Sequence, residues 1–139
     1  MVLTANSPPP TGIPRSLEKI GDHVRKARIE RGLEQKDLAN ILGVTESCIW
    51  LWENHRSGPP IPRCKGVIEF LGYDPFPEPK TFAERLVAFR RHSGFRVRDA
   101  AALANVDPAS WSSWERNEHK ITGAYRARIL PILKEAIPE

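Results

Sequence analysis

The sequence predicts an all-α protein made of two small helical domains in tandem. Apolar residues recur at helical spacing, and glycines and capping residues separate the stretches in which they do so. The second half also repeats the first. Arg28, Gly32, Val44, Trp52 and Glu53 recur as Arg90, Gly94, Val106, Trp114 and Glu115, each 62 positions later (90 − 28 = 62, and so on). Five matches at one offset, without a gap, indicate two copies of one domain.

The composition agrees with small globular domains and favours an anionic partner. The chain has 139 residues, 40% of them hydrophobic, and a net charge of +4, which suits nucleic acid without requiring it. No apolar run approaches the ~18 residues of a membrane span, and the first fifteen residues do not resemble a signal peptide. We therefore expect no membrane partner and a cytoplasmic, nucleoid-associated protein. Cys48 and Cys64 lack metal-ligand spacing and are expected to be free thiols within helices.

The first domain is expected at residues 16–72, after an irregular, proline-rich tail at residues 1–15. Ser16 is a suitable N-cap for a first helix that extends to about Arg31 and ends at Gly32. The expected buried face of this helix consists of Leu17, Ile20, Val24 and Ala27.

Two short helices follow, joined by a tight turn. The first begins near Gln35, and Leu38, Ala39 and Leu42 form its apolar face. Gly43 can end it with a positive φ, and Thr45 is a good N-cap for the next helix, which buries Ile49 and Trp52. Two helices connected in this way form a helix-turn-helix, whose second helix can lie in the major groove of DNA.

The stretch resembles the Cro and phage-repressor class of helix-turn-helix domains, also called XRE-like or lambda-repressor-like. The resemblance covers about residues 20–71 and rests on Gln35, Ala39, Gly43, Val44, Ile49, Trp52, Glu53 and Asn54. It implies that Arg28 pairs with Glu53 beneath the core. It also implies that Gln35 grips a DNA phosphate and braces the recognition helix.

By the same resemblance, certain residues would contact DNA. The base-reading positions are Glu46, Ser47 and Leu51, and the phosphate contacts are Gln35, Thr45, Trp50, Asn54 and Arg56. Structural alternatives stay open for three of them. Glu46 could instead stabilise the helix dipole, Thr45 could serve as the cap, and Leu51 could be an exposed apolar residue.

The first domain is then completed and linked to the second. Residues 55–60 have the composition of a loop, Pro62 suits the first turn of a fourth helix, and Gly72 ends the domain. Val67, Ile68 and Leu71 of this helix are expected to close the first core. Residues 73–80 alternate proline with other residues and form a stiff linker.

The second domain, residues 81–139, keeps the helix signals but departs from the contact pattern. Val97 replaces Gln35, and Asn105, which tolerates a positive φ, replaces Gly43. The other signals are the capping box of Thr81 and Glu84, the cap Asp107 before Pro108, Thr122 before the last helix, and Trp111 and Trp114 as packing residues. The remaining DNA candidates are Arg96, Arg98, Ser113 and Arg116, beside Lys120. If they do not bind DNA, a face with Val97, Ala101, Pro108 and Ala109 exposed or half-exposed would dock a protein.

The sequence therefore favours sequence-specific binding of double-stranded DNA by a transcriptional regulator. No cofactor, metal or enzymatic activity is expected, because the four histidines are scattered and no nucleophile has an evident base. The competing hypothesis is a protein-protein interaction module, such as an antitoxin-like or adaptor subunit. In that case the second domain would hold a homodimer partner or another protein.

Overall fold

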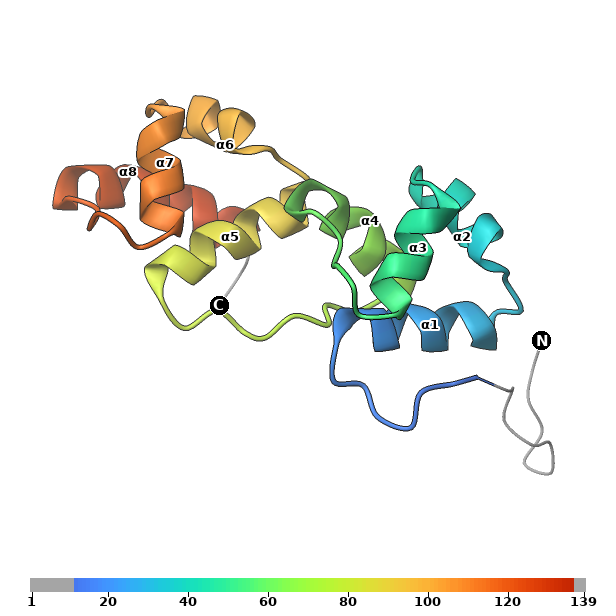
Figure 1. Cartoon of the computed structure of the whole chain (residues 1–139). Coiled ribbons are helices and arrows are strands. Elements are labelled where there is room, and N and C mark those ends of the chain that lie inside the picture. Colours follow the sequence, from blue (N-terminus) through green and yellow to red (C-terminus); the bar gives the residue numbers. More distant parts are fainter. Residues whose placement is uncertain (1–11, 137–139) are drawn as a thin grey trace. The chain divides into compact units, whose positions relative to one another are not determined.

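The structure is a computed structural model that describes residues 12–136, and within this range it is all-helical, as predicted (Figure 1). Residues 1–11 of the predicted tail lie outside the described residues. The helices of the first half are α1 (Ile20–Glu30), α2 (Gln35–Leu42), α3 (Glu46–Glu53) and α4 (Ile61–Leu71). Those of the second half are α5 (Phe82–Ser93), α6 (Val97–Ala104), α7 (Pro108–Glu115) and α8 (Gly123–Ala136).

Each helix of the second half begins 62 residues after its counterpart in the first. The offset holds for α1 and α5 (82 − 20), α2 and α6 (97 − 35), α3 and α7 (108 − 46), and α4 and α8 (123 − 61). The two turns also agree, because Gly43 and Asn105 both adopt the left-handed conformation, with φ of 69° and 56°. The repeat in the sequence is therefore matched by a repeat of local structure.

The chain divides into two compact units. The first unit contains the described residues up to Pro59 together with Val67–Phe76, and the second contains Pro60–Gly66 together with the described residues from Pro77 onward. The division passes through α4. The domain boundaries inferred from the sequence, at Gly72 and Thr81, stay a prediction.

The first unit has an apolar core between α1, α2, α3 and the second half of α4. The expected Val67 and Leu71 are buried, but Ile68 is only half-buried, and Phe70 takes its place in the core. Val67, Phe70 and Leu71 fall at i, i+3 and i+4, which is one face of a helix, whereas Ile68 lies beside that face. The guanidinium of Arg31 covers Phe70, 4.2 Å from the ring centroid.

The first helix starts later than the sequence analysis expected. It begins at Ile20 rather than after Ser16, and Leu17 is 37% exposed instead of buried. The cause is Asp22, whose Oδ2 accepts the backbone N–H groups of Glu18 and Lys19 at 3.1 and 3.0 Å. The N-cap is therefore Lys19, three residues downstream of Ser16, and Asp22, the third residue of the helix, accepts the backbone N–H of this cap.

The second unit has a separate core. Trp111 and Trp114 are both buried in it, as expected, together with Leu86, Phe89 and Ile129. The expected exposure of Ala101 is wrong, because this residue is fully buried. Ala101 is the counterpart of Ala39 (101 − 39 = 62), and its carbonyl accepts the N–H of Val106 at 2.9 Å, so it lies directly under the turn.

Candidate nucleic-acid interface

Helix α3 has one exposed and one buried face. Glu46, Ser47, Trp50 and Leu51 are exposed, with Trp50 at 48% and Leu51 at 37%, whereas Ile49, Trp52 and Glu53 are buried. The four exposed residues occupy positions i, i+1, i+4 and i+5, which form a single stripe along a helix. The structure thus brings the three base-reading candidates and Trp50 together on one surface.

The start of α3 is fixed by Thr45. Its hydroxyl accepts the backbone N–H of Cys48 at 3.2 Å, so the residue is the N-cap of the helix. The structural alternative that the sequence left open for Thr45 is therefore realised. Thr45 remains exposed, so capping does not prevent its hydroxyl from also facing a ligand. Cys48 and Cys64 are free cysteines, as expected.

A bidentate ion pair lies under α3. Arg28 donates to Glu53 through Nε, at 2.7 Å to Oε2, and through Nη2, at 2.8 Å to Oε1. The two side chains are 13% and 1% exposed, which confirms the predicted, largely buried pair. Gln35 adds a third donor, with Nε2 3.3 Å from Glu53 Oε1. The side-chain amide of Gln35 therefore connects the start of α2 to the recognition helix.

The second unit keeps the ion pair and replaces its third donor. Arg90 donates to Glu115 through Nε and Nη2, both at 2.6 Å, but Val97 stands where the first unit has Gln35. The missing donor is supplied by Trp111, whose indole Nε1 lies 2.6 Å from Glu115 Oε2. Trp111 is the counterpart of Ile49 (111 − 49 = 62). Two linked replacements thus preserve the hydrogen bonding of one buried carboxylate.

The replacement of the glutamine donor by Trp111 can be tested by restoring a glutamine at position 97. We expect Trp111→Phe to destabilise the second unit by about 1.5 to 3 kcal/mol, because a hydrogen bond to a buried charge is lost. Adding Val97→Gln to that variant should recover part of the loss, whereas Val97→Gln alone should not stabilise the chain. Urea unfolding followed by circular dichroism measures all three. If the double variant is as unstable as Trp111→Phe, the amide cannot take over the role of the indole.

The loop after α3 is attached to the start of α1. His55, at φ 59°, places its Nε2 2.8 Å from Oδ1 of Asp22. Burial raises the pKa of Asp22, but hydrogen bonds from Lys19, His55 and Glu18 outweigh this effect, and the pKa lies below its ordinary value.

The two phosphate candidates after α3 differ in their contacts. Asn54 donates from Nδ2 to the Trp50 carbonyl at 2.8 Å, so its amide also closes the end of α3. Arg56 is exposed.

The lowered pKa of Asp22 predicts an acid-dependent contribution to stability. A depressed carboxyl pKa stabilises the fold above the unfolded-state value of about 3.9, and this stabilisation is lost as the pH falls through the folded-state pKa. We expect Asp22→Ala to lower the free energy of unfolding by about 1 kcal/mol at pH 7, as for other helix caps. The difference from the natural chain should shrink below about pH 3.9. Urea titrations at several pH values measure it, and a constant difference would contradict the assignment.

The second-unit candidates have partners of their own. Arg116 binds Glu118 through two nitrogens, at 2.7 and 3.2 Å, and this hydrogen bonding raises the pKa of Arg116 and lowers that of Glu118. Ser113 is half-buried, with Oγ 3.2 Å from His119 Nδ1. Arg96 and Arg98 are exposed near the start of α6, where Arg98 lies 4.0 Å from the Asp99 carboxylate.

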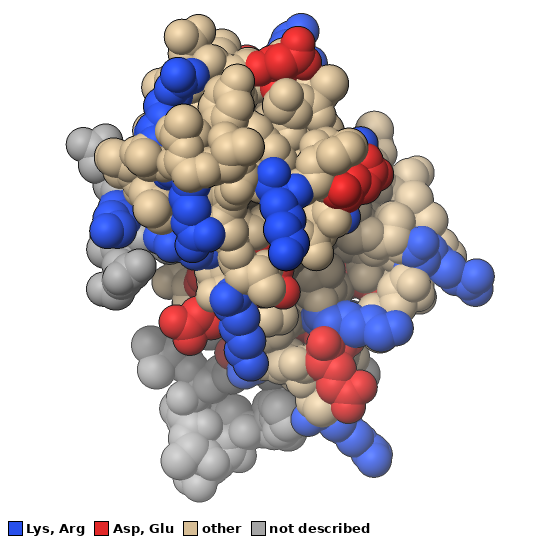
Figure 2. Space-filling model, turned by 90° about the vertical axis from the view of Figure 1, so that its left-hand side faces the viewer, with Lys and Arg blue, Asp and Glu red and all other residues tan. Residues whose placement is uncertain are grey.

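One difference between the units was missed in the sequence. Glu118 is the counterpart of Arg56 (118 − 56 = 62), so the second unit has a carboxylate where the first has an expected phosphate contact. The repeat offset alone could have revealed this exchange and the one between Ile49 and Trp111. Figure 2 shows Lys and Arg side chains spread over the face in view, with Asp and Glu side chains among them.

The described residues contain neither a metal-binding cluster nor a membrane-spanning helix. No three His, Cys, Asp or Glu side chains gather there in a way that could hold a metal ion. None of the helices of residues 12–136 has the length and apolar character needed to cross a membrane.

The comparisons with known proteins identify part of the chain. Residues 24–76 match the family model of the helix-turn-helix. No curated protein and no solved structure is a significant match. The matched segment contains α2, the turn at Gly43 and α3, and it covers one of the two predicted copies. The first half of the chain therefore contains a segment that is similar to the helix-turn-helix family.

Proposed function

We propose that the first unit binds double-stranded DNA sequence-specifically, with α3 in the major groove, and thereby regulates transcription. The observation that carries this proposal is the division of α3. Ile49, Trp52 and Glu53 hold the helix in the core, which leaves Glu46, Ser47 and Leu51 exposed in one stripe. A helix that reads base edges needs such a free face on a rigid support.

The proposed roles of these residues follow from their chemistry. Ser47 can donate to or accept from base edges, Leu51 can contact a thymine methyl group, and Glu46 can accept from cytosine N4. Trp50 is assigned to the wall of the groove beside the backbone.

The phosphate contacts are assigned to residues around the stripe, namely Gln35, Thr45, Asn54 and Arg56. Gln35 is suited to link phosphate binding to the support of α3, because the amide that approaches Glu53 belongs to the first residue of α2. A phosphate gripped at the start of α2 would thus be connected through one hydrogen bond to the base of the recognition helix.

The salt dependence of binding tests the proposal. Fluorescence anisotropy with random and genomic duplexes should reveal a fragment that the full chain prefers. On this fragment, Arg56→Gln should reduce the slope of log K against log salt by about 0.9, the value for one phosphate contact. Leu51→Ala should weaken the preference between sequences and leave the slope unchanged.

The control is Arg63→Gln, which removes an exposed arginine of α4 that is assigned no role in binding. Its slope should equal that of the natural chain. A chain that shows no preference among duplexes at any salt concentration would contradict sequence-specific recognition.

We assign a different role to the second unit, which we propose is a divergent second copy of the same domain. It lacks the counterparts of Gln35 and Arg56, because Val97 and Glu118 stand at these positions. Glu118 also forms an ion pair with Arg116. A carboxylate at the expected phosphate position repels DNA. These features favour protein docking by this unit over a second sequence-specific DNA-binding domain.

The two roles can be separated within the full chain. Removing charges from the second unit, by Arg98→Gln or Arg96→Gln, should leave the salt slope on the preferred duplex unchanged. A reduced slope would mean that the second unit contacts phosphates.

A further inference from the structure

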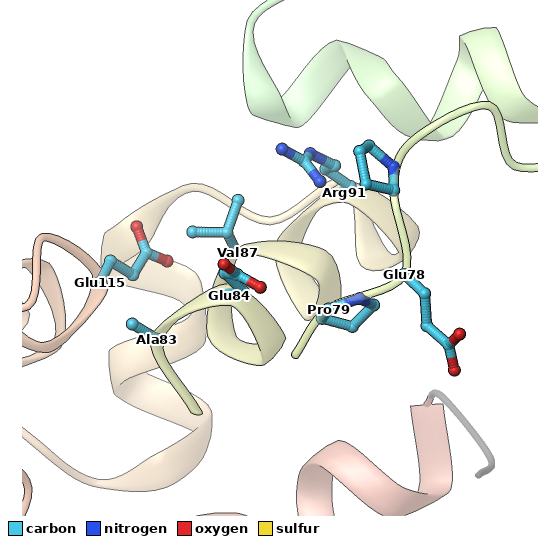
Figure 3. A pocket seen from close by; sticks show the side chains of 8 residues that line it. Glu78, Pro79, Ala83, Glu84, Val87, Arg91 and Glu115 are labelled. Atoms are coloured by element: carbon cyan, nitrogen blue, oxygen red, sulfur yellow. The ribbon is translucent and has the colours of Figure 1, made fainter. Parts of the chain in front are cut away.

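A groove of about 320 Å³ lies within the second unit, between α5, the end of α7 and the residues that precede α5 (Figure 3). Its apolar walls are Pro77, Pro79, Ala83 and Val87. Carboxylates are present as well, because Glu84 of α5 and Glu115 of α7 both line it. No role in the proposed function accounts for this groove.

The first unit has different side chains at the equivalent positions. Ala83 corresponds to Gly21 (83 − 21 = 62), where the backbone of α1 directly contacts the carbonyl of Trp52. Val87 corresponds to Arg25, whose guanidinium lies against Gly12 and whose Nε is buried. The first unit thus has a long arginine side chain at the position where the second unit has a shorter valine.

The carboxylates of the groove have acceptor sites to spare. Glu84 uses Oε2 to accept the N–H groups of Lys80 and Thr81, at 2.7 and 3.4 Å, and its Oε1 accepts nothing within the described residues. Glu115 accepts two hydrogen bonds from Arg90 and one from Trp111, whereas a carboxylate offers about four acceptor sites.

The charges around the groove favour a cation. The lining contains Glu78, Glu84 and Glu115 against Arg91, and Arg90 is bound to Glu115, so the carboxylates outnumber the guanidinium groups by three to two. Figure 3 shows the carboxylate of Glu78 pointing away from the other two, at the outer side of the groove. A ligand with an aliphatic stem and a cationic head would pack its stem on the apolar walls and bind its head at Glu84.

We propose that this groove binds an arginine side chain presented by a partner protein. The stem of the occupant would lie between Pro79 and Val87, which line the groove. Residues 1–11 and 137–139 do not supply it, because they contain no Lys, Arg or His. DNA does not fit either, since phosphates would meet Glu84. The site is independent of DNA reading by the first unit.

The test uses the full chain without DNA and a defined probe. The probe is N-acetyl-arginine N-methylamide, titrated while backbone amide signals are followed by NMR. We expect the signals of Ala83, Glu84 and Val87 to shift. The citrulline analogue has nearly the same shape without the charge and should bind roughly tenfold more weakly, the effect of losing one charged hydrogen bond.

Two variants establish where the probe binds. Val87→Arg should fill the groove from within and abolish the shifts. Glu84→Gln keeps an acceptor for the N-terminal cap, removes the charge, and should weaken binding roughly tenfold. Glu118→Gln, another exposed carboxylate of the same unit, serves as the control and should bind normally. Circular dichroism verifies that each variant folds, and Glu84→Gln decides the question if Val87→Arg does not.

Several results would overturn the proposal. These are the absence of shifts at saturating probe, equal binding of the citrulline analogue, or unchanged binding to folded Val87→Arg. Sedimentation of the chain alone adds a further outcome. A dimer that dissociates in Glu84→Gln would mean that a second copy occupies the groove instead of another protein.

Discussion

Glu53→Ala should unfold the first unit more readily by about 3 to 5 kcal/mol, because it leaves the guanidinium of Arg28 buried without its partner. The side chain of Glu53 is 1% exposed and accepts hydrogen bonds from both Arg28 and Gln35. Removing this carboxylate leaves two donors, Arg28 and Gln35, without their acceptor. The loss should be confined to the first unit, which comprises α1, α2, α3 and the second half of α4, and hydrogen exchange of their amides measures it helix by helix.

The repeat supplies a matched control for this prediction. Glu115→Ala makes the same change in the second unit, where Arg90 and Trp111 lose their acceptor, and should lower protection in α5, α6 and α7 instead. DNA binding should be lost by Glu53→Ala only to the extent that the first unit unfolds. If α1 to α3 stay protected while DNA binding disappears, Glu53 is a contact residue and its structural assignment is wrong.

Gly21→Ala should be the second most damaging change, costing about 3 kcal/mol or more, at the upper end of overpacking effects. A Cβ at this position would overlap the carbonyl oxygen of Trp52, which is backbone and cannot rotate away. Helices α1 and α3 would have to separate. An ordinary glycine within a helix behaves in the opposite way, since alanine there stabilises by up to about 1 kcal/mol.

Gly123→Ala is the control for Gly21→Ala. Gly123 begins α8, and no atom outside its own surroundings lies within 4 Å of an added Cβ. Its replacement should be neutral or slightly stabilising in the same thermal unfolding experiment. A Gly21→Ala chain that melts at the natural temperature would show that α1 and α3 can adjust without loss.

The parts of the fold that the sequence revealed are those set by local rules. Gly43, Thr45 and the Thr81–Glu84 box act on residues within four positions, so the helix ends near them follow from the chain itself. The start of α1 was misplaced because Ser16 and Asp22 are both suitable caps. Only the packing of Gly21 against Trp52, thirty-one residues away (52 − 21), shows where the helix must lie.

In the candidate site, too, the sequence predicts the features set by local rules and not those set by distant residues. The exposed stripe of α3 follows from helical spacing and the buried Trp52. The third donor to each buried carboxylate depends on two positions in different helices, Gln35 with Ile49 or Val97 with Trp111. Neither position is informative alone. Similarly, the ion pair between Glu118 and Arg116 depends on the path of the loop after α7, which helical periodicity does not predict.

The different third donors also determine which helices can pair during folding. Tandem copies of one domain risk misassembly, in which a helix of one copy docks on the other. If α7 docked on the first unit, Trp111 would enter the smaller space of Ile49 and two donors would compete for one carboxylate. If α3 docked on the second, Glu53 would face Val97 and find no third donor. Each wrong pairing would therefore leave a carboxylate with a mismatched set of donors, whereas each native pairing satisfies it.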